Sequence, residues 1–224
     1  MNFNRAVIKV GSALVAPDAN GCSGQYVAAI ADFINQCQQA GKEIILVSSG
    51  SVAAGRTLIQ HGSPIPSIPT KQAMASVGQM QMMANWQRFF DVPCSQLLIT
   101  HGDLKDRQRY INIKNTLRIL LENGVIPIVN ENDTVVTEEI RFGDNDTLAA
   151  LVANLIDADV LVILTDQQGL FDRDPRKNPD ATLIKTGVAG DRELEKLAGG
   201  SAGGLGRGGM LTKLRAAKLA ARSG

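Results

Sequence analysis

The sequence has few aromatic residues, cysteines or histidines, and no excess of either charge. Its 224 residues include 4% aromatics, three cysteines and two histidines, and 23 basic residues balance 22 acidic ones. The cysteines (Cys22, Cys37 and Cys94) are odd in number and widely spaced, which argues against a disulfide framework and against a zinc site. The balanced charge argues against binding to nucleic acid or to an anionic membrane, because both need clustered positive charge.

Long apolar segments are also missing. No uninterrupted apolar run approaches the roughly 20 residues that span a bilayer. The N-terminal residues (MNFNRAVIKVGS) show no basic region followed by a long apolar region, so no secretory signal is visible. We therefore expect a cytoplasmic protein with reduced thiols. Its length and its 44% hydrophobic content suit one large aliphatic core, or at most two small ones.

Short apolar runs alternate with helical patterns along the chain. Runs typical of buried strands cover residues 5–10, 43–48, 94–100, 125–129 and 160–164. Patterns typical of helices cover residues 25–40, 51–59, 71–90, 109–123, 146–156, 191–197 and 210–222. This order predicts an α/β fold with right-handed crossovers, namely a three-layer αβα sandwich around a mainly parallel sheet.

The densest polar segment runs from Val129 to Thr147, directly after an apolar run. It gathers carboxylates and amides around Arg141: Asn130, Glu131, Asn132, Asp133, Glu138, Glu139, Asp144, Asn145 and Asp146. Such groups need partners when they are buried, and ligands of open α/β sheets bind at the carboxyl ends of strands. We expect a substrate site here, although Asp144 could cap the next helix and Glu138 and Glu139 could form a solvated hairpin.

Two earlier strand ends carry residues that suit an anion. Lys9 lies inside an apolar run, where an ammonium needs an anionic partner unless it snorkels to solvent, and Gly11 allows close approach of a ligand. Ser49 and Gly50 follow the second run and precede a helix. The free N–H groups of that helix could bind an anion, or a serine could simply cap it.

Two later segments suit a nucleotide. Thr165 and Asp166 end the fifth run, where they could contact a nucleotide or form a turn closed by Gly169. Residues 203–213 (GGLGRGGMLTK) place glycine N–H groups and a helix start beside Lys213, as in a phosphate clamp. A surface loop is the alternative. The GxGxxG match in this segment is a weak Rossmann fingerprint because no clear strand precedes it.

These segments together favour phosphoryl transfer. Strand ends converge on one edge of a parallel sheet, so the lysines, the acids and the glycine turns would share a site. The chain shows no serine–histidine or cysteine–histidine pair. Phosphoryl transfer needs no such nucleophile, because the protein mainly positions the reactants and neutralises charge.

The sequence resembles the amino acid kinase family, and within it the branch that phosphorylates glutamate. The matching segments run in the family's order: VIKVGS (7–12), VSSGSVAAGR (47–56), KQAMASVGQ (71–79), VNENDTV (129–135), EIRFGDND (139–146), LTDQQGL (164–170) and GLGRGGMLTK (204–213). They extend over essentially the whole chain. The pair of NEND and GDND is close to diagnostic for that branch, whereas other members share only the lysines and the SSG-like turn.

The resemblance implies transfer of the γ-phosphoryl group of ATP, with Mg²⁺, to the side-chain carboxylate of L-glutamate. The product is L-glutamyl 5-phosphate, in the first step of proline biosynthesis. The implied catalytic residues are Lys9, Asp146 and Lys213, with Asp146 holding the two lysines in place. The implied substrate site comprises Ser49, Gly50, Asn130, Asp133 and Asn145. Residues 130–133 as a group would face the amino acid, with Asp133 at its amino group.

The resemblance also implies an ATP site without direct protein ligands to the metal. Its residues are Lys9, Gly11, Thr165, Asp166, Arg207, Gly208, Gly209, Met210 and Lys213. Members of the family commonly continue through further strands and often into a PUA domain, so residues 1–224 would form a kinase domain that lacks its last strands and has no PUA domain. A homo-oligomer (dimer or tetramer) and feedback inhibition by L-proline are expected. Another small-acid kinase of the superfamily and an inactive glutamate- or proline-binding module remain alternatives.

Overall fold

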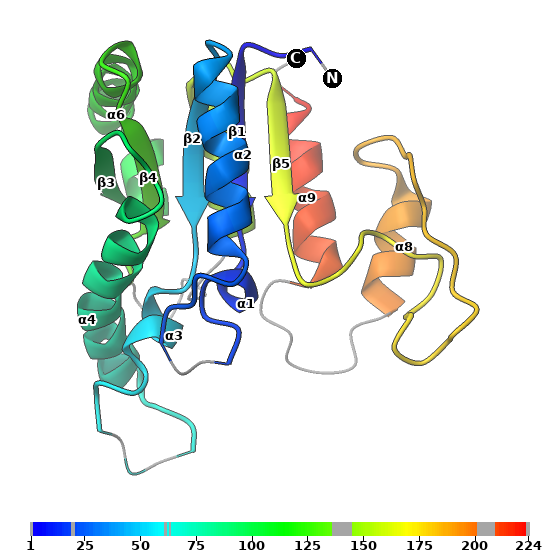
Figure 1. Cartoon of the computed structure of the whole chain (residues 1–224). Helices are drawn as coiled ribbons and strands as arrows, with labels where there is room; N and C mark the ends of the chain where they lie inside the picture. The colour runs from blue at the N-terminus through cyan, green and yellow to red at the C-terminus, as the bar shows by residue number, and fades with distance from the viewer. Residues whose placement is uncertain are drawn as a thin grey trace.

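The computed structural model describes residues 2–18, 21–60, 62, 64–135, 145–200 and 209–222. The strands of this described part form one parallel sheet in the order β3-β4-β2-β1-β5 (Figure 1). They are β1 (Arg5–Val10), β2 (Glu43–Ser48), β3 (Cys94–Ile99), β4 (Ile126–Glu131) and β5 (Val160–Leu164). The bounds of β1, β2 and β5 agree with the sequence prediction because each is a continuous apolar run.

The helices lie between and after the strands. The longer ones are α2 (Val27–Gln39), α4 (Ile68–Gln87), α6 (Arg107–Glu122), α7 (Asn145–Leu155), α8 (Arg192–Gly200) and α9 (Met210–Ala220). The short ones are α1 (Ser12–Val15), α3 (Ser51–Gly55) and α5 (His101–Lys105). The sequence analysis missed α1 and α5, because so few residues show no helical periodicity, and α3 ends before the predicted residue 59.

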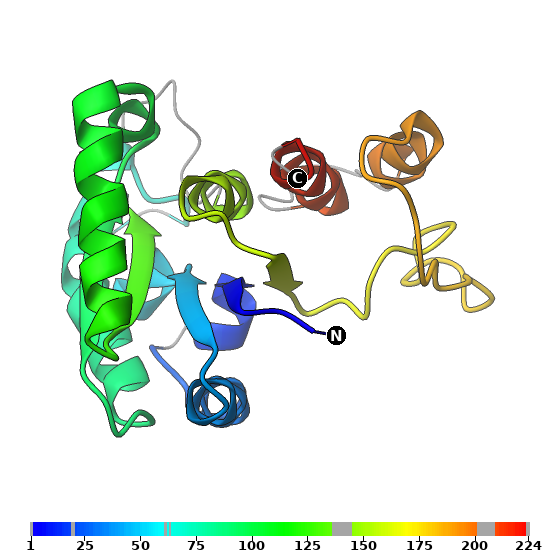
Figure 2. The same cartoon turned by 90° about the horizontal axis from the view of Figure 1, so that it is seen from above.

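Helices cover both faces of the sheet, which confirms the predicted three-layer arrangement. Figure 2 shows α2 (blue) and α7 (yellow-green) on opposite sides of the strands. Strand side chains alternate between the faces. Ile8 packs with Ile34 of α2 and Trp86 of α4, whereas Val7 belongs to a second cluster with Leu117 of α6 and side chains of α7. Each face of the sheet therefore has its own buried cluster.

The carboxyl ends of the strands all lie at one edge of the sheet, the lower edge in Figure 1, together with α1 and α3. β1 is an interior strand between β2 and β5, so it is fixed by hydrogen bonds on both sides. No helix in the described part of the chain is long and apolar enough to cross a membrane.

Candidate functional site

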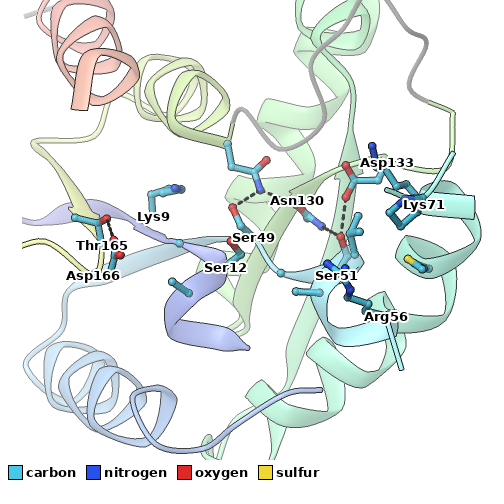
Figure 3. A pocket seen from close by; sticks show the side chains of 18 of the residues that line it. Lys9, Ser12, Ser49, Ser51, Arg56, Lys71, Asn130, Asp133, Thr165 and Asp166 are labelled. Carbon is cyan, nitrogen blue, oxygen red and sulfur yellow. Dashed lines mark hydrogen bonds between the residues drawn. The ribbon is translucent and has the colours of Figure 1, made fainter. Parts of the chain in front are cut away.

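A cavity of about 510 Å³ opens at the carboxyl ends of the strands (Figure 3). Its walls include most residues that the sequence analysis singled out: Lys9, Gly11, Ser49, Gly50, Asn130, Asp133, Asn145, Thr165, Asp166 and Lys213. These residues come from the ends of β1, β2, β4 and β5 and from the first turns of α7 and α9. The structure thus brings together segments from nearly the whole length of the chain.

Asp146 lies between two lysines beside this cavity. Its Oδ1 is 2.7 Å from Lys9 Nζ, and its Oδ2 is 3.2 Å from Lys213 Nζ. The hydroxyl of Thr212, which the sequence analysis did not single out, donates to Oδ2 at 2.8 Å. Lys9 and Asp146 are 5% and 1% exposed. Lys9 therefore has the anionic partner that burial requires, and the snorkelling alternative is wrong. We call these four residues the clamp.

The two lysines decide the ionisation of Asp146. Burial alone would raise the pKa of its carboxyl group. The charges of Lys9 and Lys213 and the hydrogen bonds from Lys9 and Thr212 outweigh burial and lower the pKa below its ordinary value of 3.8. Asp146 is therefore a carboxylate at neutral pH. Because one carboxylate faces two ammonium groups, the clamp keeps a net positive charge that suits phosphate oxygens.

A row of buried polar side chains leads away from the clamp. Asn145 donates hydrogen bonds to Ser49 Oγ and to Asn130 Oδ1, both at 2.8 Å. Asn130 donates to Ser51 Oγ at 3.4 Å, and Ser51 donates to Asp133 Oδ2 at 2.7 Å. This connected row fixes the distance between the clamp and Asp133, because each side chain is held by its neighbours.

Asp133 ends this row in a different electrostatic environment. Burial raises the pKa of its carboxyl group to about 6; the hydrogen bond from Ser51 lowers it in part, and the charge of Glu131 raises it further. Asp133 is 7% exposed, so its carboxylate is poorly solvated. A cationic group brought next to Asp133 would lower this pKa and stabilise the charged form.

The turn before α3 shapes the middle of the cavity. Gly50 has a φ of 119°, a left-handed conformation that favours glycine, and it caps the N-terminus of α3. Ser49 accepts its hydrogen bond from Asn145 and makes no side-chain bond that caps the helix. The prediction that Ser49 and Gly50 contribute to a site therefore agrees with their position, whereas α3 is a short helix of five residues.

The polar residues at the end of β4 do not face the cavity as a group. Asn130 and Asp133 line it, whereas Glu131 is directed to the other side of the strand because strand side chains alternate. Glu131 is 2% exposed, and its Oε1 is 3.6 Å from Nδ1 of His101 in α5. Asn132 also lies outside the lining. The prediction that residues 130–133 all face the substrate is therefore wrong for Glu131 and Asn132.

Sequence patterns missed Arg56 and Lys71, which also line the cavity together with Ser51. α3 and α4 bring them together by contact between their backbones. A Cβ atom at Gly78 of α4 would lie 1.9 Å from the carbonyl oxygen of Ser51. A Cβ atom at Gly55 would lie 2.0 Å from a backbone carbonyl oxygen of α4. All of these residues lie in segments that carry the family resemblance. No local pattern marks them, because the crossing of two helices brings them to one place.

The residues predicted to hold ATP lie at the clamp end or close to it. Thr165 donates to the carboxylate of Asp166 at 2.9 Å, and both line the cavity on the same side as Lys9 (Figure 3). Gly209 caps the N-terminus of α9, and Met210 is the first residue of that helix. Arg207 and Gly208 of the predicted ATP site lie outside the described residues. The same holds for four other residues that the sequence analysis considered: Glu138, Glu139, Arg141 and Asp144.

Comparisons with known proteins show the family of the chain. The family model described as "Amino acid kinase family" matches residues 4–224. The chain belongs to the amino acid kinase family. Members of this family are kinases, so the lysine-rich clamp at the strand ends lies in a fold that is used for phosphoryl transfer.

Curated members of the amino acid kinase family resemble the chain over its whole length. Glutamate 5-kinase of Idiomarina loihiensis is 52% identical over 223 residues, covering 100% of this chain and 60% of the relative. Glutamate 5-kinase of Pseudomonas aeruginosa (strain PAO1) is 56% identical over 223 residues, covering 98% of this chain and 60% of the relative. The chain therefore spans 60% of the length of these relatives.

Solved structures share the fold. Aspartate kinase from Synechocystis superposes with a TM-score of 0.64 at 24% identity, covering 98% of this chain and 36% of that chain. UMP kinase from Bacillus anthracis superposes with a TM-score of 0.60 at 12% identity, covering 97% of this chain and 84% of that chain. At these identities the likeness supports the fold alone, and it agrees with the αβα architecture.

Proposed function

We propose that the chain transfers the γ-phosphoryl group of ATP to the side-chain carboxylate of L-glutamate. The product would be L-glutamyl 5-phosphate, and the reaction the first step of proline biosynthesis. The observation that carries the proposal is a cavity with two different ends (Figure 3). The clamp lies at one end and Asp133 at the other, joined by a fixed row of hydrogen bonds. The names of the relatives at 52% and 56% identity support glutamate as the substrate.

At the clamp end, Lys9 and Lys213 would flank the phosphoryl group during transfer. Asp146 holds the two ammonium groups before ATP binds, so little reorganisation is needed as negative charge spreads over the phosphoryl oxygens. A substrate carboxylate is already deprotonated at neutral pH, so it can attack without a general base. The clamp therefore supplies positioning and charge stabilisation, which are the main requirements of this reaction.

We assign the ATP site to residues around the clamp. They are Lys9, Gly11, Thr165, Asp166, Arg207, Gly208, Gly209, Met210 and Lys213. Mg²⁺ would enter this site with ATP, where the ammonium groups of Lys9 and Lys213 suit phosphate oxygens. When bound, Mg²⁺ would neutralise phosphate charge.

At the other end, Asp133 would accept hydrogen bonds from the α-ammonium group of glutamate. The ammonium group would stabilise a carboxylate that burial otherwise disfavours. Asn145, at the clamp end of the row, would position Ser49 and Asn130, to which it donates hydrogen bonds. Ser49, Gly50 and Asn130 would shape the passage between the two ends.

Release of ADP in a coupled assay tests the proposal. L-glutamate should support turnover, whereas L-aspartate, N-acetyl-L-glutamate and UMP should not, and Lys9→Met should abolish turnover. N-acetyl-L-glutamate has no α-ammonium group for Asp133. Turnover with aspartate or UMP in place of glutamate would identify another kinase of the family. Glutamate binding without turnover would identify an inactive binding module.

The proposal extends to the organisation of the protein. We assign residues 1–224 to one kinase domain, and we expect a cytoplasmic dimer or tetramer that L-proline inhibits. Sedimentation with and without proline, together with ADP release at increasing proline concentration, tests self-association and inhibition. A monomer that proline does not inhibit would contradict both expectations.

A further inference from the structure

Two cationic side chains line the cavity at the end where Asp133 lies. Arg56 follows α3 as its C-cap, and Lys71 lies near the start of α4. Figure 3 shows both of them on the side of the cavity where Asp133 and Ser51 lie, away from Lys9. Two cationic side chains therefore line the far end of the cavity, in addition to the lysines of the clamp.

The packing of α3 against α4 holds these two cations beside Ser51. The helices touch at Gly55 and Gly78, where a Cβ atom on either glycine would overlap the backbone of the other helix. Arg56 directly follows Gly55, so its position depends on this contact. Ser51 in turn is bonded to Asp133 at 2.7 Å. One rigid unit therefore presents two cations and one carboxylate to the same part of the cavity.

We propose that Arg56 and Lys71 bind the α-carboxylate of the amino-acid substrate and, together with Asp133, select α-amino acids over simple carboxylic acids. This inference rests on the proposed function and names the groups that recognise the substrate. A substrate whose side-chain carboxylate lies at the clamp must place its α-carboxylate and α-ammonium groups at the opposite end. Cations beside a carboxylate complement that pair of charges.

An ionised Asp133 makes cations favourable at this end of the cavity. Asp133 is buried and, once ionised, would repel an α-carboxylate placed next to it. Arg56 and Lys71 line the same cavity and would offset that repulsion. The hydrogen-bonded row fixes the distance between these groups and the clamp, so the substrate must span a set length. Aspartate is one methylene shorter than glutamate and would reach only one end.

Two glutamate analogues separate the roles of the charged groups. 4-Aminobutyrate lacks the α-carboxylate, and glutarate lacks the α-ammonium group. Turnover is measured by ADP release and binding by titration calorimetry, for the unsubstituted chain and for Arg56→Met, Lys71→Met and the double variant. We expect each single substitution to lower kcat/KM for L-glutamate by about 10- to 100-fold, the effect of losing one charge-assisted contact.

The pattern across substrates is the decisive readout. Arg56→Met and Lys71→Met should lower kcat/KM for L-glutamate more than for 4-aminobutyrate. 4-Aminobutyrate has no α-carboxylate, so these substitutions remove no contact from it. Asp133→Asn should instead reduce the preference for L-glutamate over glutarate. A substitution that merely loosened the fold would lower kcat/KM for L-glutamate, 4-aminobutyrate and glutarate together. Arg56→Lys and Lys71→Arg, which keep the charge, should recover part of the binding of L-glutamate.

Arg118→Met is the matched control. Arg118 is an exposed cation of α6 outside the cavity, in a surface pair with Glu122, so its loss should leave all three kcat/KM values unchanged. Melting temperatures of all variants show whether they are folded. If Arg56→Met and Lys71→Met turn over L-glutamate with an unchanged preference over 4-aminobutyrate, the inference is wrong while the proposed function stands. If the unsubstituted chain neither binds nor phosphorylates L-glutamate, both are overturned.

Discussion

Asp146 and Asp133 are two buried carboxylates in one site, and their environments shift their pKa values in opposite directions. Asp146 is held by Lys9 and Lys213, and its pKa falls below the ordinary value. Asp133 is bonded to the neutral hydroxyl of Ser51, and burial raises its pKa to about 6. Two lysines thus form ion pairs with Asp146, while under our proposal the ammonium group of the substrate pairs with Asp133.

The two shifts have opposite effects on stability. Because its pKa is lowered in the folded state, Asp146 stabilises the fold at pH values above 3.8, the ordinary pKa that it has in the unfolded chain. This contribution is lost as the pH falls through the pKa of Asp146 in the folded state. The raised pKa of Asp133 gives a contribution that is present below 3.8 and is lost as pH rises through about 6. At neutral pH the ionised Asp133 therefore costs up to about 3 kcal/mol. One carboxylate stabilises the empty site and the other destabilises it.

Removing the charge of Asp146 should have the largest effect. Asp146→Asn removes the carboxylate that lies 2.7 Å from the buried ammonium group of Lys9, so the free energy of unfolding should fall by roughly 3–5 kcal/mol. Misplaced lysines should also lower kcat by about 10³-fold or more. Urea denaturation and ADP release measure the two effects.

Asp157→Asn is the matched control for that substitution. Asp157 forms an exposed pair with Lys114 at 3.0 Å, and asparagine tolerates its φ of 54°. Its stability and its kcat should stay close to those of the unsubstituted chain. Comparable losses in both variants would contradict the role of the clamp.

Removing the charge of Asp133 should separate binding from stability. Asp133→Asn should raise KM for L-glutamate about 100-fold, since an ionic contact with the ammonium group is lost. It should also increase the free energy of unfolding at pH 7 by about 1–3 kcal/mol, because no ionised group is then buried. Denaturation across pH should show this gain shrinking as pH falls below about 6. A variant that is less stable at pH 7 would contradict the comparison.

The same titration should appear in the kinetics. In the unsubstituted chain, KM for L-glutamate should rise about tenfold for each pH unit below about 6, as Asp133 becomes protonated and loses its attraction for the ammonium group. Initial rates between pH 5 and pH 8, about one unit below and two above that pKa, measure it. Asp133→Asn should show no such inflection, and KM for ATP should not follow it in either protein.

Gly78→Ala should disturb the Asp133 end more than the clamp. Its Cβ atom would lie 1.9 Å from the carbonyl oxygen of Ser51, so α3 must shift away from α4. We expect the free energy of unfolding to fall by about 2–3 kcal/mol. Relative to the unsubstituted chain, KM for L-glutamate should increase by a larger factor than KM for ATP. Gly102→Ala in α5 is the control, because its nearest neighbour would lie at 3.5 Å, an ordinary contact.

The smallest expected effect is that of one hydroxyl at the clamp. Thr212→Val removes the hydrogen bond to Asp146 with little change in shape, and both lysines remain. We expect kcat to fall about tenfold with KM for L-glutamate nearly unchanged. Thr116→Val, which removes a hydroxyl bonded within exposed α6, should have no effect on kcat. Equal effects of the two substitutions would exclude a specific role for Thr212.

Local patterns predicted the sheet better than the helix starts. β1, β2 and β5 are continuous apolar runs whose limits are visible in the residue types alone. α4 begins at Ile68, ahead of the predicted residue 71, because Pro69 indicates a loop by itself. In the structure, Ser67 caps the helix and Pro69 occupies its first turn, where proline needs no hydrogen-bond partner.

The lysines of the clamp could be anticipated from the sequence, whereas the cations at the other end of the cavity could not. Lys9 is conspicuous as a cation in an apolar strand, and Lys213 as a cation after glycines. Arg56 and Lys71 look like ordinary surface cations, since only the crossing of α3 and α4 brings them to the cavity. Likewise, only the alternation of β4 separates Asn130 from Glu131.

The site joins residues that lie far apart along the chain. Ser51 and Asp133 are separated by 82 positions, and Asp146 and Lys213 by 67. Contacts of this range form late in folding, because the entropy of closing long loops is lost before the contacts compensate for it. During refolding, helical signal should therefore return before the ability to turn over substrate, and the delay between the two would time the assembly of the cavity.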